Sequence, residues 1–463
     1  MERSFDAIIV GAGQAGPPLA GRLTQAGWKV ALIEKDKLGG TCVNSGCTPT
    51  KAMVASAKAA YTVAHASEYG LTGDAGMAID LRAVKARKDR IVANSRAKNE
   101  AWIRSMDGCT LVYGAARFEA ADRVRVADSV LTSDHIFINV GVRPRIPDMP
   151  GVDRVPYLTS TSILDLETLP EHLVVVGGSY VGLEFAQMFR RFGSQVTVVE
   201  RGATLLSHED GDVSEGVREA LAAEGIQFRL HAECIRLDQR ENGVVVHVSC
   251  TQGSPEVIGS HVLLAVGREP NTDGLALEQA GLSTDAHGFI PVDECLQTPV
   301  EGIWALGDCN GFGGFTHTSY NNFEVVAANL LDADPRKRSD RIPAHALFIE
   351  PPLAQVGMNE REVRQRGKPA LIGFRPMTKV NRAIEKGETR GFMKVLVDES
   401  SHEILGATIF GVGADEAIHC VLTAMYARQP SSLMARSVHI HPTVAELIPT
   451  VFQELKPLSS DAE

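Results

Sequence analysis

The chain has 463 residues, of which 44% are hydrophobic and 22% are charged, a globular composition in a chain long enough for about three domains. The net charge is −11 at pH 7 and no lysine and arginine cluster predicts a nucleic-acid surface, so we expect no nucleic-acid partner. No apolar stretch approaches the roughly 18 residues of a membrane-spanning helix, and a strand pattern at 5–10 leaves no room for a signal peptide. We therefore expect a cytoplasmic protein.

The first predicted element is a strand, loop, helix and strand unit of the kind that binds a dinucleotide. Residues 6–10 form a strand pattern, 11–16 read Gly-Ala-Gly-Gln-Ala-Gly, 19–25 are helical in pattern, and a second strand pattern at 29–33 ends at Glu34. In such a loop Gly11 permits a tight turn, Gly13 lets the backbone approach a pyrophosphate, and Gly16 allows close helix packing. Phosphate is favoured at the helix N-terminus, and Glu34 can bind a ribose hydroxyl pair.

The next segment contains two closely spaced cysteines. Residues 39–51 read Gly-Gly-Thr-Cys-Val-Asn-Ser-Gly-Cys-Thr-Pro-Thr-Lys, and helical propensity continues from Lys51. We expect Cys42 and Cys47 at the beginning of a helix, where the helix dipole favours thiolate. Their spacing is compatible with a disulfide. A metal site and two inert cysteines are the alternatives, but a metal would need more ligands and the nearest histidine is His65. We interpret the pair as a redox dithiol with no metal, and expect the other six cysteines to be reduced.

The dinucleotide-binding pattern then recurs. A strand at 172–176, a loop at 177–182, a helix at 183–192 and a strand at 195–199 lead to Glu200. Gly177, Gly182 and Glu200 each follow the corresponding residue of the first unit, Gly11, Gly16 or Glu34, by 166 residues. Ser179 replaces the middle glycine of the loop, so we expect the second site to bind its nucleotide less tightly than the first. Two nucleotide sites follow, one for a flavin and one for a nicotinamide. Glu200 favours NADH, while Arg201 could accept the 2′-phosphate of NADPH, so the choice stays open.

Strand patterns at 391–397 and 403–410 and a helix pattern at 414–427 indicate an α+β unit at the C-terminal end. His441 can be argued chemically from its surroundings there. A substrate thiolate needs a proton, a dithiol needs a base, and imidazole titrates in the range for both. Glu446, five residues on, could orient the ring.

The dithiol segment, both glycine loops, Ala305-Leu306-Gly307-Asp308 and His441-Pro442-Thr443-Val444-Ala445-Glu446 together resemble the pyridine nucleotide–disulfide oxidoreductases. This family contains glutathione reductase, dihydrolipoamide dehydrogenase and mercuric reductase. The resemblance implies an α/β fold with two Rossmann-like, three-layer ββα dinucleotide-binding domains and a C-terminal α+β dimerisation domain. We expect the FAD-binding domain at 1–145 and 271–340, the NAD(P)-binding domain at 146–270, and the dimerisation domain at 341–463.

The resemblance also implies roles for individual residues. Glu34 would contact the adenosine ribose and Asp308 the ribityl chain, with Thr41 and Lys51 beside the isoalloxazine and Lys51 paired with Glu184. Tyr180 would cover the nicotinamide pocket until the nucleotide enters. Cys47 would be the flavin-proximal sulfur and Cys42 the exchange sulfur, and His441 with Glu446 would reach the active site of the partner in a homodimer. The predicted FAD site comprises Gly11, Gly13, Gly16, Glu34, Lys35, Gly40, Thr41, Lys51, Gly141 and Asp308, and the predicted NAD(P) site comprises Gly177, Ser179, Tyr180, Gly182, Glu184, Glu200 and Gly267.

Within the family the chain looks most similar to mercuric reductase and to the hypochlorous- and hypothiocyanous-acid-responsive flavoproteins. Residues 47–51, 381–383, 389–392 and 446–449 carry this likeness. Mercuric reductase has a cysteine pair near its C-terminus, whereas the last cysteine of this chain is Cys420. Mercuric reductase also has other residues in place of the His-Pro segment, which is intact in this chain. We therefore expect an FAD-dependent NAD(P)H:disulfide oxidoreductase that reduces a small oxidised sulfur or electrophilic substrate. Dihydrolipoamide dehydrogenase is the alternative, and a non-catalytic flavin redox sensor is an alternative of another class.

Overall fold

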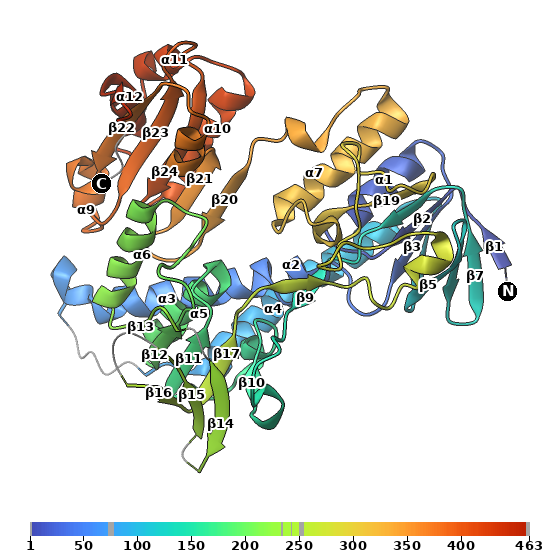
Figure 1. The fold of residues 1–463 in the computed structure, drawn as a ribbon, viewed down its shortest axis with the longest axis horizontal. Coiled ribbons are helices and arrows are strands. Elements are labelled where there is room, and N and C mark those ends of the chain that lie inside the picture. Colours follow the sequence, from blue (N-terminus) through green and yellow to red (C-terminus); the bar gives the residue numbers. More distant parts are fainter. Residues whose placement is uncertain (1, 73–77, 233–234, 242, 250–253, 460–463) are drawn as a thin grey trace.

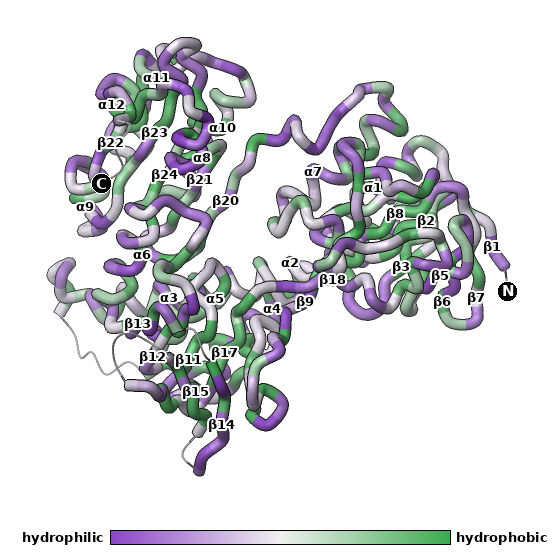
Figure 2. The backbone as a smooth tube through the Cα atoms, in the orientation of Figure 1, coloured by the Kyte–Doolittle hydropathy of each residue, from purple (hydrophilic) through white to green (hydrophobic). Residues whose placement is uncertain are grey.

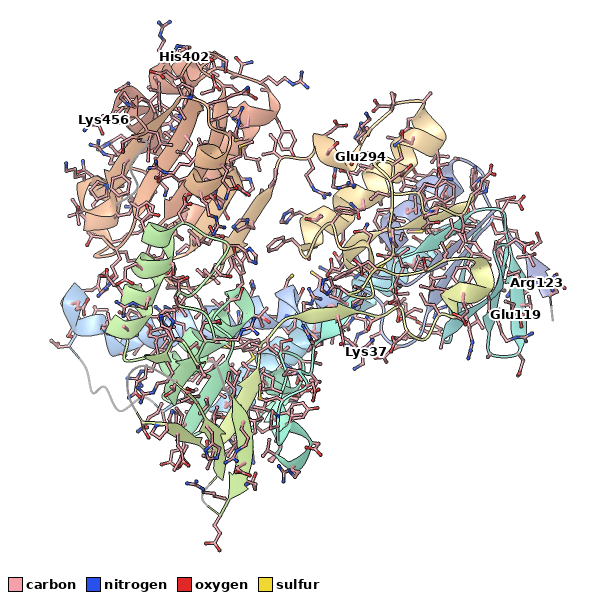
Figure 3. All side chains as sticks on the ribbon, viewed as in Figure 1. Lys37, Glu119, Arg123, Glu294, His402 and Lys456 are labelled. Carbon is pink, nitrogen blue, oxygen red and sulfur yellow. The ribbon has the colours of Figure 1, made fainter. Side chains whose placement is uncertain are left out.

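The computed structural model describes residues 2–72, 78–232, 235–241, 243–249 and 254–459. Figure 1 shows three lobes, each built around its own sheet, which we call the first, middle and C-terminal lobes in order of their first strands. Charged side chains such as Glu119 and Arg123 point outward at the far edge of the first lobe (Figure 3). No helix in the described part of the chain combines the length and the apolar character that crossing a membrane requires.

The first lobe contains a five-stranded parallel sheet in the order β19-β8-β2-β3-β4. Its strands are β2 (Ala7–Val10), β3 (Val30–Glu34), β4 (Cys109–Tyr113), β8 (Ile136–Ile138) and β19 (Ile303–Ala305). A four-stranded sheet covers one face, formed by β1 (Glu2–Ser4), β5 (Ala116–Ala120), β6 (Arg123–Val126) and β7 (Ser129–Thr132). The helices α1 (Gly16–Gln25) and α7 (Thr316–Ala327) lie against the other face.

Alternation along β2 explains these three layers. Ile8 packs in the core that contains Phe118 and Leu131 of the second sheet, whereas Ile9 packs in the core that contains Leu19 of α1. Successive side chains of a strand point to opposite faces, so a strand that is buried throughout must be covered on both sides. The apolar cores follow the central strands in Figure 2.

The middle lobe repeats the parallel sheet, in the order β10-β17-β11-β12-β13. Its strands are β10 (Tyr157–Leu158), β11 (His172–Val176), β12 (Gln195–Val199), β13 (Gln227–Arg229) and β17 (His261–Leu264), and its helices are α5 (Tyr180–Phe192) and α6 (Gly211–Ala223). A three-stranded antiparallel sheet lies beside it, made of β14 (Arg236–Arg240), β15 (Gly243–His247) and β16 (Glu256–Gly259). Both nucleotide-binding units therefore have the same order of elements from strand to terminal acid.

Two features join the first and middle lobes. The chain crosses between them through an antiparallel ribbon of β9 (Val142–Pro144) and β18 (Arg268–Pro270). The long helices α3 (Cys47–Ala64) and α4 (Leu81–Arg104) pack against each other, and α3 also packs along α5 (Figure 1). The N-terminal end of α3 consequently lies near the junction of the lobes.

The C-terminal lobe is a six-stranded antiparallel sheet in the order β20-β21-β24-β23-β22-β25. Its strands are β20 (Ala344–Leu347), β21 (Leu353–Gly357), β22 (Ala370–Pro376), β23 (Phe392–Asp398), β24 (Ile404–Phe410) and β25 (Lys456–Pro457). Its helices are α8 (Glu360–Gln365), α9 (Asn381–Glu385), α10 (Ala414–Tyr426), α11 (Ser431–Arg436) and α12 (Ile448–Gln453). The predicted α/β fold with a C-terminal α+β unit is confirmed.

One local prediction is wrong. The two cysteines do not begin a single helix, because Cys42 lies in a separate short helix, α2 (Gly40–Asn44), and only Cys47 begins α3. Gly46 between them has φ −126° and ψ −117°, which is outside the helical region. This break lets the two thiol-bearing segments turn toward each other.

Candidate active site

The two glycine loops share an unusual backbone geometry. Gly11 has φ +107° and Gly177 has φ +116°, a left-handed region that L-residues with a side chain rarely adopt. A Cβ on Gly11 would collide with the carbonyl oxygen of Asn139, and one on Gly177 with that of Ala265. Each loop therefore passes directly against the end of a neighbouring parallel strand, where the following helix N-terminus offers its amides to phosphate.

The acid at the end of each second strand is held in the same way in both units. Glu34 accepts hydrogen bonds from the amides of Ala12 and Asp36 at 3.0 and 2.9 Å, and Glu200 accepts from those of Gly178 and Gly202, both at 2.7 Å. Each acid and each of its two amide donors in the second unit lies 166 positions after the corresponding residue in the first unit. The amides fix each carboxylate while leaving it lone pairs for the hydroxyls of a ribose.

The first loop borders a cavity. The cavity has a volume of about 300 Å³, and Gly13, Gln14 and Gly39 form part of its lining. Gly40 has φ +62°, and a Cβ there would lie 2.8 Å from the Cα of Gly13, so a side chain would fill the space between the two segments. Bare backbone on both sides is what a pyrophosphate needs for close approach, and the residues present fit FAD.

The dithiol lies at the break between α2 and α3. Cys42 and Cys47 are both free thiols, and Cys47 Sγ lies 3.3 Å from the hydroxyl oxygen of Thr316 at the start of α7. A hydrogen bond from Cys42 lowers the pKa of Cys47 to about 6, aided by Thr316 and by the charge of Lys51. The same hydrogen bond and burial raise the pKa of Cys42. At neutral pH Cys47 is therefore the thiolate and Cys42 keeps its proton.

Lys51 links this dithiol to the middle lobe. Its Nζ lies 2.8 and 2.7 Å from the two carboxylate oxygens of Glu184 on α5, and 4.6 Å from the ring centroid of Phe348. Glu184 is buried and also accepts a hydrogen bond of 3.0 Å from the amide of Phe348. The ion pair implied by the resemblance is present, and it places a fixed positive charge beside Cys47.

The other predicted FAD residues surround the first loop and the lobe crossing. Asp308 accepts a hydrogen bond of 3.2 Å from the Ser319 hydroxyl and lies 3.2 Å from Nη1 of Arg268. Gly141, and Gly267 from the predicted NAD(P) site, both have positive φ and stand at the two ends of the ribbon of β9 and β18, with open space where a Cβ would lie. Lys35 and Thr41 are exposed.

Tyr180 begins α5 directly after Ser179 of the second loop. Its hydroxyl donates a hydrogen bond to Glu209, which also contacts Nε2 of His345 at 2.7 Å. Burial and the neighbouring Glu209 raise the pKa of Tyr180, so the phenol keeps its proton. The residues that the sequence assigns to nicotinamide binding thus adjoin those around the dithiol.

His441 lies elsewhere, on the segment between α11 and α12 at the top of Figure 1. Its Nδ1 is 2.8 Å from a carboxylate oxygen of Glu446, and 70% of its side chain is exposed. Val438 and Ile440 beside it are 97% and 80% exposed. Among the described residues no contact joins His441 to the dithiol of its own chain, so its apolar, open surroundings leave it free to face another subunit.

The same arrangement recurs in known proteins. The family model for "Pyridine nucleotide-disulphide oxidoreductase" matches residues 5–329 of this chain. The model for the dimerisation domain of the same family matches residues 343–452. The probable pyridine nucleotide-disulfide oxidoreductase RclA of Escherichia coli is 34% identical over 98% of this chain and 99% of its own length. The chain belongs to the pyridine nucleotide–disulfide oxidoreductase family.

Other members are similar over comparable lengths. The mercuric reductase of Streptomyces lividans is 32% identical over 96% of this chain and 94% of its own, and the dihydrolipoyl dehydrogenase of Chlamydia pneumoniae is 32% identical over 96% of each. A structure of the Cu(II) complex of RclA, described as an HOCl-induced flavoprotein disulfide reductase, has a TM-score of 0.89 at 33% identity and covers 97% of this chain and 99% of that one.

Membership in the pyridine nucleotide–disulfide oxidoreductases confirms the predicted class. The protein is an FAD-dependent flavoprotein disulfide oxidoreductase that uses NADH or NADPH. The dimerisation domain supports a homodimer. The roles of the individual site residues stay predictions. Of the six cysteines expected to be ordinary thiols, Cys109, Cys295, Cys309 and Cys420 are free, and Cys234 and Cys250 lie outside the described residues.

Several residues of this pyridine nucleotide–disulfide oxidoreductase site were not predicted. Thr316, Glu209 and His345 contact predicted residues, and Asn139 donates a hydrogen bond of 3.1 Å from its side chain to the carbonyl of Gly11. Asn139 directly follows a short strand pattern, which is a usable signal in the sequence. The other three come from segments that only the tertiary fold brings to the site.

Proposed function

We propose that this enzyme uses NADH to reduce a small oxidised sulfur compound, or another small electrophile, through Cys42 and Cys47. The observation that carries the proposal is the setting of the dithiol, in which Cys47 begins α3, lies 3.3 Å from the Thr316 hydroxyl and adjoins the ion pair of Lys51 with Glu184. Cys47 is stabilised as a thiolate by three neighbours, whereas Cys42 holds its proton and donates to it. The likeness to RclA supports the substrate class, because HOCl is a strong oxidant of thiols and RclA is described as induced by it.

The two sulfurs would act in sequence. Cys42 attacks the electrophilic atom of the substrate, and the leaving group departs with its electron pair. The Cys47 thiolate then attacks the Cys42 sulfur, which forms the disulfide and releases the reduced substrate. FAD, held by the first glycine loop and Glu34, would supply the two-electron transfer that returns this disulfide to the dithiol.

The raised pKa of Cys42 means that a base must accept its proton during the attack. We propose that His441 of the partner subunit supplies this base and later protonates the leaving group, so the active site is shared in the homodimer. The contact of Nδ1 with Glu446 supports this role, because it fixes the ring and leaves Nε2 available.

We also propose a cytoplasmic location, where thiols are kept reduced.

We propose NADH in preference to NADPH because of Glu200. Both of its oxygens are held by backbone amides at 2.7 Å, so the carboxylate cannot turn away from the ribose without losing two hydrogen bonds. A 2′-phosphate placed there would meet a fixed like charge, whereas a 2′-hydroxyl can donate to it. Arg201, the alternative phosphate ligand, is exposed.

The test is anaerobic reduction by each nucleotide followed by turnover with a panel of hypothiocyanite, lipoamide, glutathione disulfide, Hg(II) and Cu(II). Cu(II) is included because RclA forms a Cu(II) complex. We expect fast turnover of hypothiocyanite with NADH, and its loss in Cys42→Ser without loss of bound FAD. Equal turnover by the Cys42→Ser variant would overturn the proposed roles of the two sulfurs.

Dihydrolipoamide dehydrogenase activity is the second candidate. The contact of His441 with Glu446 favours it as well, since a dithiol substrate also needs a base. Rapid and selective oxidation of dihydrolipoamide with NAD would establish this alternative and displace the first.

A further inference from the structure

Tyr180 lies between the second glycine loop and the dithiol. It follows the loop residue Ser179 directly, and it shares one face of α5 with Glu184, which is four residues further on and binds Lys51. Its ring meets the ring of Phe315 edge-on, with 6.4 Å between the centroids. Phe315 precedes Thr316, the residue in contact with Cys47. The Tyr180 ring thus adjoins both the second loop and the segment that contacts the dithiol.

The hydroxyl of Tyr180 is tied to a carboxylate that cannot move freely. Glu209 accepts its hydrogen bond, and only 2% of the Glu209 side chain is exposed. The next residue, Asp210, binds the amides of Glu360 and Arg361 and the buried ammonium of Lys394 at 2.8 to 3.1 Å. The segment that holds Glu209 is thereby fixed to the C-terminal lobe.

His345 on β20 completes the attachment. Its Nε2 lies 2.7 Å from the Glu209 oxygen that also accepts from Tyr180. Burial would raise the pKa of Glu209, but the hydrogen bond and charge of His345 together with Tyr180 lower it, so the carboxylate is ionised. The ring of His345 also stacks on Phe315 at 5.9 Å between centroids and meets Tyr180 edge-on at 5.6 Å.

We propose that Glu209 and His345 are positioning residues that hold Tyr180 across the nicotinamide path, so that nucleotide binding must break the bond between Tyr180 and Glu209. The proposal rests on the proposed function, because it assumes that the second loop binds the nicotinamide nucleotide. Displacing the Tyr180 ring then consumes part of the binding free energy of the nucleotide. A variant that weakens the hold of Glu209 and His345 on Tyr180 should therefore bind the nucleotide more tightly. Because His345 belongs to another lobe, the position of the C-terminal lobe contributes to nucleotide affinity.

The decisive variants are Tyr180→Phe, which keeps the ring and removes the hydroxyl, and His345→Phe, which keeps the stacked ring and removes the donor. We expect each to lower the dissociation constant of NAD for the oxidised, FAD-loaded enzyme by about tenfold, the effect of losing one hydrogen bond to a charged group. The double variant should show little further change, because both substitutions break the same attachment. His345→Gln restores a donor and should return the constant toward wild type.

His317→Phe is the matched control. His317 stacks on the same Phe315 at 5.4 Å, but its Nε2 contacts the carbonyl of Ala344 and not Glu209. Calorimetric titration with NAD gives the dissociation constants without turnover, and in the His317→Phe control the limiting rate of anaerobic reduction by NADH should stay unchanged. Unchanged or weaker binding in both decisive variants, or an equal gain in the control, overturns this proposal. A wild-type enzyme that binds neither NAD nor NADPH would instead overturn the proposed function.

Discussion

Replacing Thr316 by valine tests how the protein stabilises the Cys47 thiolate. Valine keeps the shape of threonine but cannot donate the hydrogen bond that spans 3.3 Å to Cys47 Sγ. A hydrogen bond to a charged group contributes about 1.5 to 3 kcal/mol, and because Cys47 is exposed we take the lower value. This corresponds to about one pKa unit. The pKa of Cys47, about 6 in the wild type, should therefore rise to about 7.

The assay is alkylation of the reduced enzyme by iodoacetamide between pH 5 and 9, with modification at Cys47 measured by peptide mass spectrometry. The alkylation rate follows the thiolate fraction, so at pH 6 the variant should react about fivefold more slowly than the wild type. Thr318→Val on the same helix is the control, and its profile should match the wild type. A Thr316→Val profile with an unshifted midpoint would refute the reasoning.

Three further predictions concern other parts of the chain. Glu200→Gln should lower kcat/KM for NADH by about tenfold relative to that for NADPH, because one of two amide contacts and the charge are lost; an unchanged ratio in steady-state assays contradicts this. Lys394→Met should lower the free energy of unfolding in urea by about 3 kcal/mol, since it leaves the buried Asp210 carboxylate with its amide donors but without the ammonium that pairs with its charge, whereas the exposed Lys379→Met should change it little. The lowered pKa of Asp210 means that this difference shrinks as acid protonates that carboxylate. His441→Gln should slow substrate turnover but leave flavin reduction by NADH unchanged in stopped-flow measurements; slower flavin reduction would place His441 elsewhere in the cycle.

Local patterns were enough to predict the two nucleotide-binding units. The strand at 172–176 and the strand at 195–199 were located to the residue, because buried parallel strands are continuous apolar runs bounded by glycine. The helices α1 and α5 begin before the predicted starts of 19 and 183, since the glycine loop itself forms their first turn. Boundaries of this kind depend on backbone geometry that composition does not encode.

Contacts between distant segments could not be predicted from the sequence alone. Thr316 approaches Cys47 from 269 positions further along the chain, and His345 approaches Glu209 from 136 positions away. Neither residue belongs to a motif, and each acquires its partner only through the packing of lobes. The resemblance to a known family did imply the pairing of Lys51 with Glu184, but it said nothing about what fixes Tyr180.

The central claim is that Cys42 and Cys47 form a disulfide that accepts an electron pair from reduced FAD and becomes the dithiol. Anaerobic reductive titration of the FAD-loaded enzyme tests it most directly. Wild-type enzyme should take up about twice as many electrons per FAD as Cys42→Ser, because the disulfide and the flavin each accept a pair. Equal uptake by the two proteins would contradict the claim.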